Sequence, residues 1–284
     1  MKTSGWIVLS LLVVSTMACT ITIPRVQMPE PGETQVMEVN VAAPSGEQGS
    51  TLNINMGAGK LTLDGDGSGL VSGTIRYSLD ILKPVIERNE NEVSINQQVE
   101  INNAFTPNNY ENDWDLALGN TPMDLYVRAG AYEGQFDLSG IPLTGLDIQD
   151  GASNVEISFD DPNPEEMSLF NYRTGASNVD MTGLANANFS HMVFNSGAGS
   201  YSMDFSGQLQ QDANVRITSG VSNLEITVSD GYRTRITLTG GLNNVSTHGT
   251  WTVDNDIYET GSGDHLLDIV IDMGVGSLDL SQKS

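Results

Sequence analysis

The chain has one cysteine, few basic residues and three histidines, and each shortage excludes a class of function. A single Cys cannot form an intramolecular disulfide, and it cannot build a Cys-based zinc site. Lys and Arg total 12 against 36 Asp and Glu, which gives a formal net charge of −24. Because phosphates need a basic surface, we expect no nucleic-acid partner. The acidic balance is typical of a well-hydrated surface, or of one that collects cations weakly.

Common catalytic motifs are also missing. The sequence contains no G-x-S-x-G elbow, no P-loop and no H-E-x-x-H motif. His191, His248 and His265 have no neighbours at metal-ligand spacing. We therefore expect a protein that is not an enzyme and that carries no cofactor.

The N-terminus has the order of a signal peptide. An apolar stretch over residues 6–14 follows a basic residue, and small residues lead to Cys19. The stretch is shorter than a membrane span. Ala18-Cys19 resembles a bacterial lipobox, in which the chain is cut before the Cys and the thiol carries a diacylglycerol, although Thr16 stands where Leu is usual. We expect a lipoprotein signal peptide over 1–18 and a lipid anchor at Cys19 on the extracytoplasmic face of the cell membrane; ordinary secretion with an incidental Cys is the alternative.

The segment that follows is rich in proline. Residues 20–35 contain three prolines and little periodicity. This composition is typical of an extended chain rather than of a packed element. We predict a tether over 19–35 that holds the folded domain away from the lipid.

The rest of the chain shows the alternation of β-strands. In residues 51–65, Leu52, Ile54 and Met56 fall on one face of a strand, and Leu61 and Leu63 follow a Gly-Ala-Gly break. Such period-two patterns, punctuated by Gly, Asn, Asp and Ser, predict strands joined by turns. We see no convincing helix after residue 36, so the predicted fold class is all-β.

A short string repeats along this part of the chain. GASNV occurs from Gly151 and again from Gly175, and looser copies recur about every 22 residues. An apolar–polar–apolar triplet follows the glycine in most copies, as in Val155-Glu156-Ile157, so the outer two residues should point inward. One short strand cannot bury its face alone, whereas stacked repeats can, which favours a β-helix or solenoid; a β-sandwich is the alternative. The glycines are Gly57, Gly130, Gly151, Gly175, Gly197, Gly220, Gly241 and Gly274.

Each position of the repeat has an expected role. Glycine permits a backbone corner, and the small residue after it, mostly Ala, should tuck into the bend. The asparagines that precede the triplets should stack as a ladder of side-chain amides. These asparagines are Asn154, Asn178, Asn223 and Asn244.

The strings INMGAGKLTLDG, GASNVEISFDDPNP, GAGSYSMDFSG and RITSGVSNLEITV, in this order, resemble the toast-rack domain. This extracytoplasmic β-repeat module occurs in LiaF-like cell-wall stress response proteins and in bacterial lipoproteins. The resemblance implies a single-stranded, right-handed β-helix-like fold and no catalytic residues. LiaF-like proteins carry membrane-spanning helices before the domain, whereas this chain has a lipobox-like signal there, which argues against a transmembrane signalling role.

The resemblance also divides the chain. We predict an N-terminal β region of the toast-rack module over 36–118 and a C-terminal β-repeat domain over 119–284. The expected function is that of a membrane-anchored surface lipoprotein with an interaction domain, in cell-envelope structure or stress response, whose partner is an envelope protein or a glycan. A glycan- or cation-binding module is the alternative, and a polysaccharide-active β-helix enzyme is a weaker one.

Two sets of residues are candidate sites. Glu156, Asp180 and Glu225 occupy the same outward position of three repeats, with Ser202 between them, and form a possible binding row. Asp64, Asp66 and Ser68 match the first ligand positions of an EF-hand loop, but Ile75 stands where a bidentate Glu is needed. A Gly-rich hairpin turn is the simpler interpretation of this stretch, and a weak calcium site is the alternative.

Overall fold

The computed structural model describes residues 32–44, 49–97, 110–241 and 243–283. Within these residues the protein is all-β, as predicted, with two short 3-10 helices, η2 (Asp80–Leu82) and η3 (Leu184–Ala187). The strands are β1 (Gln35–Val41), β2 (Ser50–Asp64), β3 (Val71–Tyr77), β4 (Pro84–Asn89), β5 (Glu92–Gln97), β6 (Asn112–Leu118), β7 (Met123–Asp137), β8 (Leu143–Ser158), β9 (Phe170–Thr182), β10 (His191–Phe205), β11 (Ala213–Ser229), β12 (Arg233–Gly240), β13 (Asn243–His248), β14 (Thr252–Asp254), β15 (Ile257–Thr260) and β16 (Leu266–Lys283).

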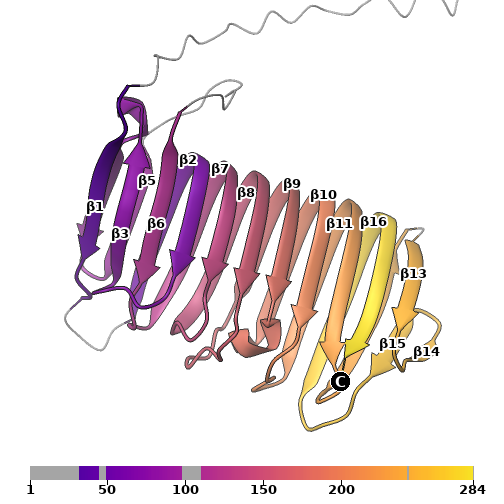
Figure 1. Ribbon diagram of the computed structural model, residues 1–284. Coiled ribbons are helices and arrows are strands. Elements are labelled where there is room, and N and C mark those ends of the chain that lie inside the picture. Colours follow the sequence, from indigo (N-terminus) through magenta and orange to yellow (C-terminus); the bar gives the residue numbers. More distant parts are fainter. Residues whose placement is uncertain (1–31, 45–48, 98–109, 242, 284) are drawn as a thin grey trace, which may run out of the picture.

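These strands form one large mixed sheet that does not close. Its order is β1-β3-β6-β2-β7-β8-β9-β10-β11-β16-β12-β15-β14, while β13 pairs with β16, and β5 pairs with β2 and β4. A β-sandwich would have two separate sheets, so that alternative does not describe the molecule. Figure 1 shows the long strands standing side by side in a row.

The sequence repeats correspond to the long parallel strands. From β2 through β7, β8, β9, β10, β11 and β16, neighbouring strands pair in parallel and keep the repeats in register. Ala152 lies opposite Ala176, Ala176 opposite Ala198, and Ala198 opposite Val221. The predicted alignment of the repeats is therefore confirmed.

Each long strand folds over at its repeat glycine. In β11 the side chains alternate between core and solvent until Ser219, which is buried; Gly220 and Val221 are both exposed, and Ser222 is buried again. Two successive outward residues reverse the phase, so both halves of the strand send side chains into one core. Figure 1 shows the strands passing over the upper edge of the molecule. We call this edge, formed by the repeat glycines and the residues after them, the ridge.

The ridge separates two outer surfaces. The front face consists of the outward side chains of the strand halves that follow the ridge glycine, together with those of β6 and β13. The back face consists of the outward side chains of the halves that precede it. Between the two halves lies an apolar core, in which the Phe194 ring packs edge-on against Tyr172 and Tyr201 with centroids 5.5 and 5.0 Å apart.

The ridge glycines are required by sterics rather than by an unusual backbone angle. None of the eight repeat glycines has a positive φ. A Cβ on Gly175 would instead lie 2.5 Å from the carbonyl oxygen of Gly151 in the neighbouring strand, and a Cβ on Gly197 would lie 2.5 Å from that of Gly175. The corner position was predicted correctly, but the reason is the close approach of successive backbones.

Two other roles that the sequence predicts for residues of the repeat differ from what the structure shows. In most repeats the residue after the glycine does not tuck inward: Ala176 is exposed and the inward side chain is Ser177, whereas Ala58 is buried. The four asparagines share one row of the register, but Ser200 and Ser277 interrupt it. In the described part of that row, Ser277 Oγ donates a hydrogen bond to Asn223 Oδ1 at 2.9 Å.

The C-terminal strand is not the last strand of the row. β16 lies between β11 on one side and β12 and β13 on the other, so the repeat of Gly274 precedes the repeat of Gly241 in space. The tail after Leu280 continues β16 to Lys283 and is inside the sheet. At the opposite end, β1 and β4 are the edges of the sheet.

Candidate functional site

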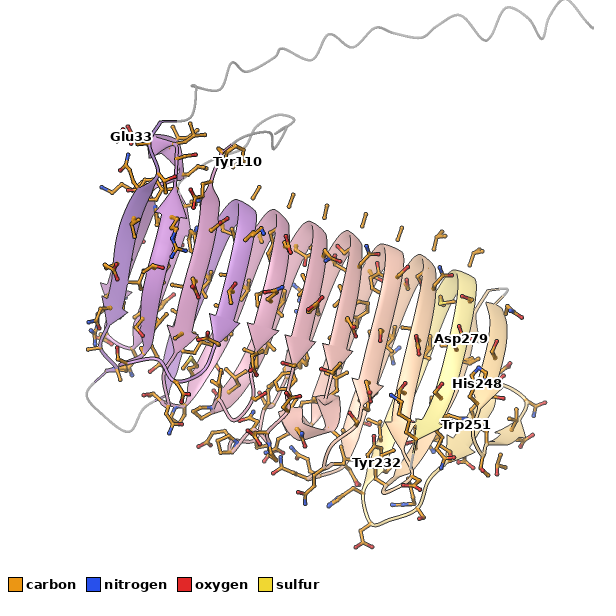
Figure 2. The ribbon with its side chains drawn as sticks, viewed as in Figure 1. Glu33, Tyr110, Tyr232, His248, Trp251 and Asp279 are labelled. Atoms are coloured by element: carbon orange, nitrogen blue, oxygen red, sulfur yellow. The ribbon has the colours of Figure 1, made fainter. Side chains whose placement is uncertain are left out.

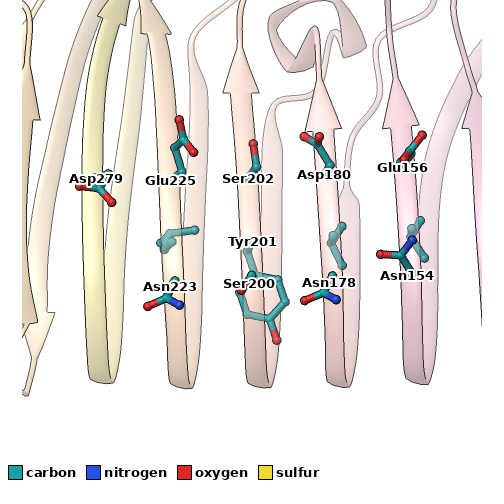
Figure 3. A pocket seen from close by; sticks show the side chains of 13 residues that line it. Asn154, Glu156, Asn178, Asp180, Ser200, Tyr201, Ser202, Asn223, Glu225 and Asp279 are labelled. Carbon is teal, nitrogen blue, oxygen red and sulfur yellow. The ribbon is translucent and has the colours of Figure 1, made fainter.

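The predicted binding row exists as a geometric feature of the front face. Glu156 pairs with Asp180, Asp180 with Ser202 and Ser202 with Glu225, so the four lie side by side on neighbouring strands. The three carboxylate residues are exposed. The row continues to Asp279 of β16, which the prediction did not include. Figure 3 shows these side chains aligned across the strands, and Figure 2 places Asp279 toward the C-terminal end of the front face.

A shallow groove runs along this row. Its volume is about 360 Å³, and its floor is the surface of the sheet itself. One side is formed by the carboxylate row and the other by the amides and hydroxyls of the neighbouring row. The polar side chains that line it are Asn154, Glu156, Asn178, Asp180, Ser200, Ser202, Asn223, Glu225 and Asp279.

The front face is acidic well beyond this row. In the front halves of β2, β7–β11 and β16, and in β6, the basic residues are two lysines. Lys60 Nζ lies 3.6 Å from Glu133 Oε2, and Lys283 Nζ lies 3.2 Å from Asp204 Oδ2. Most of the carboxylates therefore have no cation beside them. The acidic residues are Asp64, Asp113, Asp115, Glu133, Asp137, Glu156, Asp180, Asp204, Glu225 and Asp279.

The calcium candidate lies at one end of this face. Asp64 ends β2, and Asp66 and Ser68 follow in the turn to β3. The turn is confirmed but the hairpin is not, because β6 lies between β2 and β3 in the sheet. The loop instead crosses the end of β6, where Gly67 N donates to Leu118 O at 2.9 Å. Among the described residues, no group of three or more His, Cys, Asp or Glu is placed to hold a metal ion.

Burial and neighbouring carboxylates change the pKa of Asp64. Burial, with the negative charges of Asp115, Asp137 and Asp66, raises the pKa of Asp64 above its usual value. A carboxyl whose pKa is higher in the folded state destabilises the fold when ionised, and this penalty disappears as the pH falls below its unfolded pKa. We expect Asp64→Asn to raise the melting temperature at pH 7 and to leave it unchanged at pH 3, as measured by thermal unfolding. A larger effect at pH 3 than at pH 7 would contradict this assignment.

The back face has a different charge pattern. Arg128, Arg173 and Arg216 are exposed there on β7, β9 and β11. Within the described part of the chain, none of the three lies within ion-pair distance of a carboxylate. Two acids of the back face, Asp124 on β7 and Asp147 on β8, are already engaged: Asp124 accepts from Thr144 Oγ1 and Asp147 from Asn171 Nδ2, both at 2.7 Å.

Beneath the ridge lies a polar network that the sequence reasoning missed. Asp150 is only 9% exposed and accepts hydrogen bonds from Tyr172 Oη at 2.9 Å, from Ser153 Oγ at 3.0 Å and from Thr174 Oγ1. Burial, with Tyr132 and Asp150 nearby, raises the pKa of Tyr172 well above its usual value, so this hydroxyl stays protonated and donates. The signal was present: alternation from Leu146 and Ile148 places residue 150 inside.

Residues 30–171 match the family described as the N-terminal domain of toast_rack. The chain belongs to the toast-rack family. Toast-rack domains are extracytoplasmic, so the folded part of this toast-rack protein lies outside the cytoplasm. Curated protein sequences contain no significant match to it.

One solved structure supports the fold. The toast-rack protein is similar to the crystal structure of a candidate cell adhesion protein from Clostridium sporogenes, with 22% identity and a TM-score of 0.51, over 88% of this chain and 99% of that chain. A candidate adhesin from Bacteroides fragilis is more distant, with 9% identity and a TM-score of 0.32, over 87% of this chain and 97% of that chain. At 22% identity the likeness to the Clostridium sporogenes protein concerns the fold alone.

The predicted lipid anchor belongs to the N-terminal part of the chain. Cys19, the signal peptide over 1–18 and most of the tether fall outside the described residues. No helix in the described ranges is both long and apolar enough to span a membrane.

Proposed function

We propose that this toast-rack protein is a lipid-anchored, non-enzymatic protein of the bacterial envelope that works by binding through its front face. Three observations support this function: the lipobox-like sequence at Cys19, the extracytoplasmic family and the likeness to a candidate cell adhesion protein. In this proposal the repeat strands are the turns of a right-handed single-stranded β-helix, which serves as a stiff support for the binding surface.

The arrangement of polar side chains on the front face is the main support for this proposal. Its polar side chains are held in rows by strand pairing, so a ligand that spans several strands meets equivalent groups at intervals of about 4.8 Å. Glu156 and its equivalents already lie in such a row, because strand pairing fixes their register and the strands that carry them pack on the apolar core. A preorganised surface loses little entropy on binding.

The anchor is tested at Cys19. We expect cells that express the wild-type protein to incorporate labelled palmitate into it and to retain it in the membrane fraction. Cys19→Ser should lose the label and release the protein, since each buried CH₂ of a lipid chain contributes about 0.8 kcal/mol to membrane binding. Gel fluorography and fractionation of the same cultures measure both effects.

A matched variant controls for damage to the signal peptide. Thr20→Ser changes the next residue without removing the thiol, and it should be labelled and retained like the wild type. Equal release of the wild type and Cys19→Ser, with no label in either, would show that the protein is secreted without a lipid anchor.

A further inference from the structure

The partner of the front face can be inferred from the charges on the opposite side of the molecule. We propose that the front face of one copy docks on the back face of a second copy, with Asp180 and Glu225 of the first opposite Arg128 and Arg173 of the second. The inference rests on the proposed function only in taking the front face as the binding surface.

The front face supplies carboxylates at a fixed interval. Asp180 of β9 and Glu225 of β11 lie in one row of the register with Ser202 of β10 between them. They are therefore two strands apart, or about 10 Å at the usual strand spacing. Both are exposed, and neither is within ion-pair distance of a described Lys or Arg.

The back face supplies guanidinium groups at the same interval. Arg128 of β7 and Arg173 of β9 share the row nearest the ridge, with Gln149 of β8 between them. The row continues through Asn195 and Thr218 without a carboxylate before β16. Both arginines are exposed, and the Arg128 Cζ lies 5.9 Å from the Tyr126 ring centroid.

The two faces are complementary in charge as well as in spacing. A chain with three times as many acidic as basic residues would be expected to pair each arginine internally, yet these two have no described ion-pair partner. Arg also suits this role because its planar guanidinium binds carboxylates in a bidentate manner. A second copy supplies those carboxylates, at a matching spacing, from its front face.

The symmetry of such a contact determines the assembly. Front-to-back docking is heterologous, so each copy keeps one free face and association continues beyond a dimer. Copies anchored through the same end in one membrane present their strands in the same order, and the two rows meet when one copy is shifted along the row by two strands, or about 10 Å. We therefore expect lateral arrays rather than a closed oligomer.

Sedimentation velocity tests this proposal on the purified full-length chain in a zwitterionic detergent. At 20 mM NaCl the average sedimentation coefficient should rise with protein concentration, and at 500 mM NaCl the association constant should fall about tenfold or more because the charges are screened. Asp180→Arg with Glu225→Arg should abolish self-association, as should Arg128→Glu with Arg173→Glu. Mixing the two reversed variants should restore association, because each offers the face that the other needs.

A second charge reversal separates docking from net charge. Asp160→Arg with Asp161→Arg makes the same change in net charge as the front-face variant, but at two exposed turn residues away from both rows. This variant should associate like the wild type or more strongly. Thermal unfolding of every variant verifies that it is folded.

Several results would overturn the proposal. A wild type that stays monomeric at low salt, a front-face variant that associates normally, or a mixture without rescue would each do so. A monomeric wild type that releases heat with calcium or with cell-wall fragments would assign the front face to a cation or a glycan instead. Fatty-acid labelling at Cys19 is independent of these outcomes, so loss of the anchor and loss of self-association are distinguishable.

Discussion

Gly175→Ala is expected to destabilise the protein by about 3 kcal/mol, although it adds one methyl group at an exposed ridge. The new Cβ would lie 2.5 Å from Gly151 O and 3.4 Å from Gly151 C. Both are backbone atoms held by the pairing of β8 and β9, so no side-chain rotation relieves the contact. The two strands would have to separate locally, which weakens their hydrogen bonds. Urea unfolding followed by circular dichroism measures the shift in midpoint.

The neighbouring residue provides the control. Ala176→Val adds two methyl groups one position further along the ridge, where the equivalent residues Val221 and Val275 are 62% and 59% exposed. We expect a change within about 0.5 kcal/mol, as for other exposed substitutions. If Gly175→Ala unfolded at the wild-type midpoint, the repeat glycines would not be a steric requirement, and their recurrence would need another cause.

What the sequence reveals of this fold is its local geometry. Alternation is a property of neighbouring residues, so Val155-Glu156-Ile157 could be assigned to core, solvent and core before any pairing was known. Pairing order is a long-range property. The repeat of Gly274 carries the same local pattern as the others, and nothing in it shows that β16 inserts between β11 and β12. The hairpin predicted after Asp64 was wrong for the same reason.

The candidate site was predictable to the same degree. The outward positions of Glu156, Asp180 and Glu225 follow from the alternation, and their alignment follows from the constant repeat. The charge of the back face was missed, although Arg128 and Arg173 each stand two residues before a repeat glycine and so share one position of the repeat. Asp150 was missed because a carboxylate next to glycine in sequence resembles a solvated turn, whereas here it is held by hydroxyls from two strands.

Asp150→Ala is the second substitution with a large expected effect, again about 3 kcal/mol. It would leave the buried hydroxyls of Tyr172, Thr174 and Ser153 without their common acceptor. A buried hydroxyl that loses its partner costs about 1–3 kcal/mol, and these three can only partly rebond to one another. Removing a buried charge returns part of this cost. Urea unfolding at pH 7 measures the sum.

Two variants separate the acceptor role from the charge. Asp150→Asn keeps one carbonyl oxygen for the hydroxyls of Tyr172 and Thr174 while removing the charge, so it should lose clearly less stability than Asp150→Ala. Asp180→Ala removes an exposed carboxylate on β9 and should change stability by no more than about 0.5 kcal/mol. Were Asp150→Ala as stable as Asp180→Ala, the hydroxyls would have to satisfy themselves in another arrangement. The carboxylate would then be dispensable for joining β8 to β9 beneath the ridge, and the backbone ladder and apolar core alone would hold the repeats in register.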